Sequence, residues 1–151
     1  TAGNSSQIAD GASAMLMASE RAAEQLGVRP RARFRGFAVC GDDPVTMLTA
    51  PIPATRKVLT RSGVALGDID HVEINEAFGS VVGAWFAETG ADPKITNPNG
   101  GAIALGHPLG ATGAVLTAKL LYELKRTRKR YGIVSMCIGG GMGAAGLFER
   151  V

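Results

Sequence analysis

The most regular pattern of hydrophobic and polar positions in this chain begins just after residue 77. Large apolar side chains recur there at i, i+3, i+4, i+7 and i+8, which is the repeat of an amphipathic helix. The residues are Phe78, Val81, Val82, Trp85 and Phe86. Gly90 follows them, and glycine commonly ends a helix. The spacing therefore predicts a helix that starts near Phe78 and ends at Gly90.

Three other segments carry helical signals. Ser19 suits the N-cap of a helix over residues 20–26. Proline is tolerated in a first helical turn, so a second helix is expected from near residue 53 to Gly63. Its predicted buried positions are Val58 and Leu59. Thr112 suits the N-cap of a third helix that ends near residue 127. The apolar face of this helix consists of Leu116, Leu120, Leu121 and Leu124.

Five short segments have the composition of β-strands, because β-branched or other apolar residues dominate them. They are residues 14–18, 33–40, 69–74, 131–137 and 144–149. Strands that alternate with helices indicate an α/β domain with a layered, mixed and mostly parallel sheet covered by helices. The last two strands are close enough in sequence to form an antiparallel hairpin.

Composition narrows the class of protein. The chain has 151 residues, of which 46% are hydrophobic and 19% charged, so a folded domain with a core is expected. Aromatic residues make up only 5%, which argues against a nucleic-acid interface. A basic run near the end of the third helix fits cations at a helix C-terminus. It consists of Arg126, Arg128, Lys129 and Arg130. No apolar run is long enough to span a membrane.

The two cysteines, Cys40 and Cys137, show neither CxxC nor Cys/His ligand spacing, so no metal site and no disulfide framework are expected. This usage fits a reducing compartment, and we expect a cytoplasmic location. The chain begins at Thr1 without an initiator methionine. We therefore expect it to be a mature or excised piece of a longer protein.

A glycine-dense stretch over residues 97–113 carries His107, one of only two histidines. The glycines and Pro108 constrain the loop around the ring, and a neutral imidazole can act as a general base. A purely structural histidine and a phosphate-binding loop are the alternatives. A P-loop is excluded because GxxxxGK[ST] is absent. The other histidine, His71, is expected to be structural.

Two further loops stand beside regular elements. Asn75 follows the strand at 69–74 and could cap the next helix or hold a water or carbonyl oxygen at a strand end. Cys137 ends a strand before a run of glycines, so it is either a small buried residue or a thiol beside exposed backbone N–H groups. Residues 141–146 match GxGxxG, but only five residues follow, too few for a dinucleotide fold. We expect the three loops to converge on one reaction centre.

At these three loops the chain resembles the thiolase family of acyl-CoA acyltransferases. The matching stretches are residues 75–78, 99–113 and 137–143, together with 1–12 and 51–57. The resemblance covers essentially the whole chain but only the later part of a thiolase. It implies one of the two similar α/β domains of a five-layer sandwich, with residues 1–12 as a lead-in and 13–151 as the C-terminal domain. The nucleophilic cysteine of the family lies in the N-terminal half, and Cys40 matches no catalytic position.

The resemblance also implies roles. His107 would activate the nucleophilic cysteine and, with a water held by Asn75, form an oxyanion hole. Cys137 would be the acid and base at the substrate α-carbon, and the Gly139 N–H would contribute to a second oxyanion hole. The positions that match contacts to coenzyme A are Ser6, Met47 and Phe78.

The implied reaction is acyl transfer between a 3-ketoacyl-CoA and coenzyme A, with no covalently bound cofactor. We expect a degradative 3-ketoacyl-CoA thiolase of fatty-acid or related β-oxidation. An acetyl-CoA C-acetyltransferase, or an isolated or split domain that is inactive without its N-terminal partner, is the alternative. A homo-oligomer, dimer or tetramer, is the expected assembly.

Overall fold

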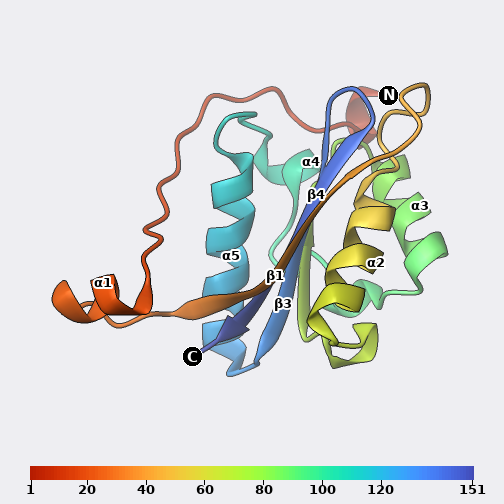
Figure 1. Ribbon diagram of the computed structural model, residues 1–151. Helices are drawn as coiled ribbons and strands as arrows, with labels where there is room; N and C mark the ends of the chain where they lie inside the picture. The colour runs from red at the N-terminus through yellow and green to blue at the C-terminus, as the bar shows by residue number, and fades with distance from the viewer.

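A four-stranded sheet forms the centre of the computed structural model, which describes all of residues 1–151 (Figure 1). The strands are β1 (Ala32–Gly41), β2 (His71–Ile74), β3 (Tyr131–Ile138) and β4 (Met142–Arg150). The helices are α1 (Glu20–Gln25), α2 (Pro51–Ser62), α3 (Gly79–Thr89), α4 (Ala102–Leu105) and α5 (Thr112–Thr127). Short 3-10 turns cover Ala2–Asn4, Leu66–Asp68 and Pro93–Ile95. The order of strands across the sheet is β1-β4-β3-β2.

The sheet is mixed, as the sequence predicts, but the prediction of a mostly parallel sheet is wrong. Only β2 and β3 pair in parallel, whereas β3 with β4 and β4 with β1 pair antiparallel. Gly140 and Gly141 adopt positive φ angles and close the tight β3–β4 hairpin, which makes that pair antiparallel. β1 then takes the outer edge of β4 rather than the free edge of β2.

Helices cover both faces of the sheet, with α2 and α3 on one side and α5 on the other (Figure 1). The larger core cluster lies between the sheet and helices α2 and α3. In it, Trp85 of α3 and Val58 of α2 are fully buried. The Trp85 indole Nε1 donates a hydrogen bond to Thr55 Oγ1 at 3.1 Å, so its polar atom is satisfied inside the core. The smaller cluster contains Leu116, Leu120, Leu124, Val134 and Phe148.

The predicted helices form with small changes at their ends. Ser19 caps α1 by accepting the Ala22 N–H, and Gly63 and Gly90 end α2 and α3 in the left-handed conformation. α2 begins at Pro51 rather than near residue 53, because its first helical turn tolerates both prolines. Of its two predicted buried positions, Val58 is buried and Leu59 is half-buried.

The strand predicted at residues 14–18 is wrong. This segment has no regular secondary structure, and the Leu16 and Met17 side chains are 73% and 69% exposed. It belongs to an extended stretch that arches from the N-terminus to α1, away from the sheet (Figure 1). A short apolar run shows that a segment can be buried, but burial also needs a surface to pack on, and this chain offers none there.

Three other elements differ from the prediction in their bounds or type. Thr112 is not the N-cap of α5 but its first residue, and Ala111 is the N-cap. The short helix α4 lies inside the glycine-dense stretch, where the sequence predicts only a loop. Predicted strand 69–74 is shorter than expected because residues 66–68 form a 3-10 turn, and all four residues of β2 are buried.

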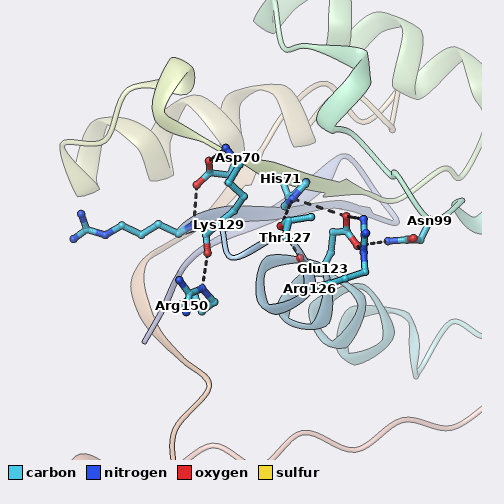
Figure 2. Close-up of polar contacts among 9 residues, drawn as sticks. Asp70, His71, Asn99, Glu123, Arg126, Thr127, Lys129 and Arg150 are labelled. Atoms are coloured by element: carbon cyan, nitrogen blue, oxygen red, sulfur yellow. Dashed lines mark hydrogen bonds and ion pairs between the residues drawn. The ribbon is translucent and has the colours of Figure 1, made fainter.

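The end of the sheet where β3 begins carries the predicted basic run (Figure 2). Arg126 lies in the last turn of α5, and its guanidinium donates two hydrogen bonds to the buried Glu123 carboxylate at 2.8 and 2.6 Å. Lys129 lies 3.6 Å from Asp70. His71 Nε2 lies 2.9 Å from Thr127 Oγ1, which agrees with the structural role expected for this histidine.

Candidate active site

Asn75 and Cys137 lie at the same edge of the sheet because β2 and β3 run in parallel. Ile74 pairs with Ser135, and the Asn75 backbone N–H donates to the Ser135 carbonyl at 2.9 Å. Asn75 therefore leaves β2 beside the last residues of β3. The loop that carries His107 joins α4 to α5 at this same end of the molecule, together with the tip of the β3–β4 hairpin (Figure 1). This is the carboxyl edge, where open α/β sheets bind ligands.

The Asn75 side chain joins the other two candidate residues. It is 1% exposed, and its Nδ2 lies 3.5 Å from His107 Nε2. It also lies near the Cys137 thiol, where it offsets part of the rise in the pKa of that thiol that burial causes. Its Oδ1 is buried and has no partner in the chain. Asn75 is not a helix cap, because the N-cap of α3 is Phe78, which forms no side-chain cap hydrogen bond.

The His107 ring is held by Thr112, a residue whose part the sequence does not reveal. His107 Nδ1 lies 2.7 Å from Thr112 Oγ1, and that hydroxyl donates its only hydrogen to the Pro108 carbonyl at 2.9 Å. We therefore assign the hydrogen between His107 and Thr112 to Nδ1. This leaves the lone pair on Nε2, directed toward Asn75. Burial lowers the pKa of His107, so the ring is neutral at pH 7 and can accept a proton at Nε2.

The lead-in segment packs along the loop that carries His107. The His107 N–H donates to the Gln7 carbonyl at 2.9 Å, and the Ser6 N–H donates to the Ala77 carbonyl at 3.0 Å. Gly106 has a φ of +96°, and a Cβ there would lie 2.8 Å from the Ala9 side chain. The loop can thus run close to the lead-in only because this position is glycine.

Cys137 is a protonated thiol at neutral pH. Burial raises its pKa, and the neighbouring polar groups of its own backbone and of Asn75 offset only part of that rise. Such a thiol is suited to donate a proton to a carbanion and to take it back. It is not suited to act as a nucleophile, which would require a thiolate at neutral pH. Gly139 follows at the exposed start of the hairpin turn, where nothing lies within 4 Å of the place a Cβ would occupy.

The three remaining candidate positions lie at this same end of the molecule, and two of them are adjacent. Ser5 forms a β-bridge with Phe78, so Ser6 lies beside Phe78, whose side chain is 44% exposed. Met47 lies in the loop after β1, which contacts the hairpin through the Asp42 N–H and the Gly141 carbonyl at 2.7 Å. Met47 has a φ of +63° and an exposed side chain. No hydrogen bond joins Met47 to the other two.

Cys40 stands apart from these residues. It pairs with Gly143 of β4, which in turn pairs with Cys137 of β3, so a whole strand separates the two cysteines. With neighbouring strands about 4.8 Å apart, the two Cα atoms are about 10 Å apart, too far for a disulfide. Both thiols are free.

The chain shows neither a metal-binding cluster nor a membrane-spanning helix. No group of three or more His, Cys, Asp or Glu side chains is arranged to hold a metal ion. None of the helices is both long enough and apolar enough to cross a membrane.

Comparison with known proteins gives one consistent result. A family model described as "Thiolase, C-terminal domain" matches residues 28–150. The chain is 58% identical over 151 residues to the steroid 3-ketoacyl-CoA thiolase FadA6 of Mycobacterium tuberculosis, and it covers 37% of that protein. It is 50% identical over 151 residues to an acetyl-CoA acetyltransferase of Shinella zoogloeoides, and it covers 38% of it.

Solved structures agree with this result. The structure of human mitochondrial 3-ketoacyl-CoA thiolase in complex with CoA superimposes on the whole chain with a TM-score of 0.93 at 42% identity. The Bacillus anthracis acetyl-CoA acetyltransferase superimposes with a TM-score of 0.97 at 43% identity. In both cases this chain covers 38% of the other chain.

Proposed function

Because this chain belongs to the thiolase family, of which it carries the C-terminal domain, we propose that the protein containing it is a thiolase-type acyl-CoA acyltransferase. Its reaction is acyl transfer between a 3-ketoacyl-CoA and coenzyme A, by thiolysis or by the reverse Claisen condensation. The observation that carries the proposal is the position of Asn75, whose amide lies 3.5 Å from His107 Nε2 and which leaves β2 beside the end of β3 that carries Cys137.

His107 is the base in this proposal. Its Nε2 lone pair takes the proton from a cysteine that the N-terminal half of the protein supplies, and that thiolate attacks the 3-keto carbon. Cleavage between C2 and C3 then leaves the shortened acyl group on the cysteine and releases the enolate of acetyl-CoA. The thiol of a second coenzyme A then attacks the acyl-cysteine, takes the acyl group as the shortened acyl-CoA and frees the cysteine. His107 and a water held by Asn75 form one oxyanion hole. The unpartnered Oδ1 of Asn75 supports this, because a buried carbonyl oxygen needs a donor.

Cys137 protonates the enolate at its α-carbon during thiolysis and removes that proton during condensation. A thiol whose pKa burial raises is suited to this, because it holds its proton until a stronger base appears. The Gly139 N–H contributes to a second oxyanion hole, shared with the N-terminal domain. We assign contacts with coenzyme A to Ser6, Met47 and Phe78, whose segments contact the Asn75 loop and the β3–β4 hairpin.

The site needs a second domain to be complete. The side chains of Ile8, Leu16 and Leu109 are largely exposed, and a partner that covers them would shield apolar surface from water. We propose that this partner is a thiolase N-terminal domain, in the same chain or in a separate subunit, that residues 13–151 form the C-terminal domain, and that residues 1–12 lead into it. We further propose that the assembled protein is a cytoplasmic homo-oligomer, either a dimer or a tetramer.

We base the proposed substrate class on the names of the relatives to which this chain is similar. We favour a degradative 3-ketoacyl-CoA thiolase of lipid β-oxidation, because the steroid 3-ketoacyl-CoA thiolase is 58% identical to this chain. An acetyl-CoA acetyltransferase of short-chain metabolism is the second candidate, because a relative with that name is 50% identical. Turnover of acetoacetyl-CoA compared with longer or bulkier 3-ketoacyl-CoA esters distinguishes the two.

Substitutions in the longer protein test the mechanism. His107→Ala and Cys137→Ala should each lower kcat about 10²–10⁴-fold, and change KM for coenzyme A far less, because each removes a positioned acid or base. Cys40→Ala is the matched control for Cys137→Ala and should leave kcat unchanged. Residues 1–151 alone should catalyse no thiolysis. A loss below tenfold in both catalytic variants would contradict the proposed roles.

A further inference from the structure

The carboxylate of Glu76 lies next to the catalytic Asn75 and has no cationic partner. Its Oε1 accepts a hydrogen bond from Asn97 Nδ2 at 2.9 Å, and its Oε2 accepts one from the Ile103 backbone N–H at 3.2 Å. The two donors come from the two sides of the turn that opens the glycine-dense stretch. The carboxylate therefore joins two backbone segments through neutral donors and without an ion pair.

One of these donors is fixed to β2. Asn97 accepts the Ile74 N–H at its Oδ1 and donates from Nδ2 to the Ile74 carbonyl, both at 2.9 Å. Its own N–H donates to the Val72 carbonyl at 2.8 Å, and it adopts a φ of +46°. Asn97 thus continues the edge of the sheet beside β2. The side of Glu76 that faces Asn97 is anchored to the strand that positions Asn75.

The other donor, the Ile103 N–H, belongs to the segment that leads directly to His107. Ile103 lies in α4, which consists of only four residues and leads through Gly106 to His107. Any shift of Ile103 relative to β2 therefore also shifts the imidazole relative to Asn75, whose Nδ2 lies 3.5 Å from His107 Nε2.

Gly101 makes room for the carboxylate. A Cβ at this position would lie 2.0 Å from Glu76 Cδ, whereas its φ of −129° is open to any residue. Glycine is required there for space and not for backbone conformation. The carboxylate therefore packs directly on the backbone that begins α4, which leaves α4 little freedom to slide.

The same loop is held from the opposite side by Lys119 of α5. Its Nζ donates to Glu73 Oε2 at 2.7 Å and also to the Gly100 carbonyl. Glu73 is 1% exposed and lies on β2, two residues before Asn75. Two acidic residues that flank Asn75 thus both act on residues 97–103.

We propose that Glu76 is a positioning residue for catalysis: its carboxylate ties α4 to the strand that carries Asn75 and so fixes His107 Nε2 against the Asn75 amide. This rests on the proposed acyl-transfer function. The Glu76 carboxylate hydrogen bonds to Asn97 and Ile103 and to none of Asn75, His107 and Cys137. Its effect passes through Ile103 and α4 to the imidazole.

Glu76→Gln in the longer protein tests the proposal. An amide keeps the shape of the carboxylate but turns an N–H₂ group toward one of the two donors, so one hydrogen bond becomes a repulsive contact. The expected result is a fall in kcat of about tenfold or more, with KM for coenzyme A changed less than about threefold. Glu88→Gln is the matched control, because Glu88 pairs with Arg56 on the exposed surface of α3. It should leave kcat unchanged.

A measurement that needs no turnover separates this proposal from the proposed function. Histidine-selective NMR of the longer protein, with the signals of His107 and His71 assigned, reports both imidazoles, and His71 at the far end of the sheet is the internal reference. Glu76→Gln should shift the ring signals and titration of His107 and leave those of His71 in place. An inactive parent protein with that shift would refute the acyl-transfer function but support the positioning role.

Unchanged His107 signals together with an unchanged kcat would overturn the positioning role. If the glutamine variant does not fold, Glu76→Asp provides the milder test. The shorter side chain can keep one of the two hydrogen bonds, so a smaller loss of kcat and a smaller shift of His107 are expected. An aspartate variant identical to wild type in both measurements would likewise overturn the proposal.

Discussion

Replacing Thr112 by valine would remove the hydroxyl that fixes the orientation of the His107 ring. Valine has nearly the same shape as threonine, so the packing at the start of α5 is kept. What is lost is the acceptor for His107 Nδ1–H at 2.7 Å and the donor to the Pro108 carbonyl at 2.9 Å. The imidazole can then carry its proton on Nε2, where it cannot accept one from a thiol.

The size of the effect follows from the free energy of one hydrogen bond. A net intramolecular hydrogen bond contributes about 0.5–1.5 kcal/mol, which corresponds to a change of about 2–12-fold in the population of the competent tautomer. We therefore expect kcat to fall about 3–10-fold in Thr112→Val. This is far less than the loss expected when the whole ring is removed in His107→Ala. Thr112→Ser keeps the hydroxyl and should lose little.

The assay is steady-state thiolysis at saturating coenzyme A by the longer protein, corrected for the folded fraction. Loss of the hydrogen bond to Pro108 should lower Tm by a few degrees, which is measured separately by calorimetry. Histidine-selective ¹⁵N NMR reports whether Nδ1 or Nε2 carries the hydrogen. The reasoning is refuted if Thr112→Val keeps kcat within twofold of wild type and Nδ1 remains protonated.

Two predictions concern stability. The Arg126 guanidinium lowers the pKa of Glu123 to about 2 from its usual 4.5, so the pair stabilises the fold fully above pH 4.5. This contribution is lost as the pH falls through about 2, and it is at most about 3 kcal/mol because water screens the exposed arginine. Denaturant unfolding across this range should show the decline, and Glu123→Gln should flatten it; an equally steep decline in the variant would contradict the assignment. Gly143→Ala would place a Cβ 2.6 Å from the backbone of Ala50, which a side-chain rotation cannot relieve. We expect a loss of at least about 1–3 kcal/mol in the free energy of unfolding. Gly67→Ala, where nothing lies within 4 Å, is the control, and equal losses in the two variants would show that crowding is not the cause.

Local signals in the sequence were sufficient for most of the helices and strands. The period of α3, the leucines of α5, and the caps at Ser19, Gly63 and Gly90 all predicted elements that the structure contains. These features depend on residues close together in the chain, so the local amino-acid sequence is enough to predict them. The three loops that carry Asn75, His107 and Cys137 could also be singled out in this way.

Features that depend on distant partners could not be predicted. Residues 14–18 have the composition of a strand but pair with no other strand. β1 pairs with β4, and this makes most of the sheet antiparallel. Which edge a strand pairs with depends on the relative stability of pairings between segments far apart in sequence, and local composition does not determine it.

The family, most of the regular elements and the residue types available for chemistry follow from the amino-acid sequence. How these residues act together depends on the folded arrangement. It placed the Asn75 amide between His107 and Cys137, turned the predicted cap Thr112 into the partner of His107 Nδ1, and filled the space above Gly101 with the Glu76 carboxylate. The physical reason is that a hydrogen bond depends on distance and direction in space, and these are set only when the parallel strands and the helices pack.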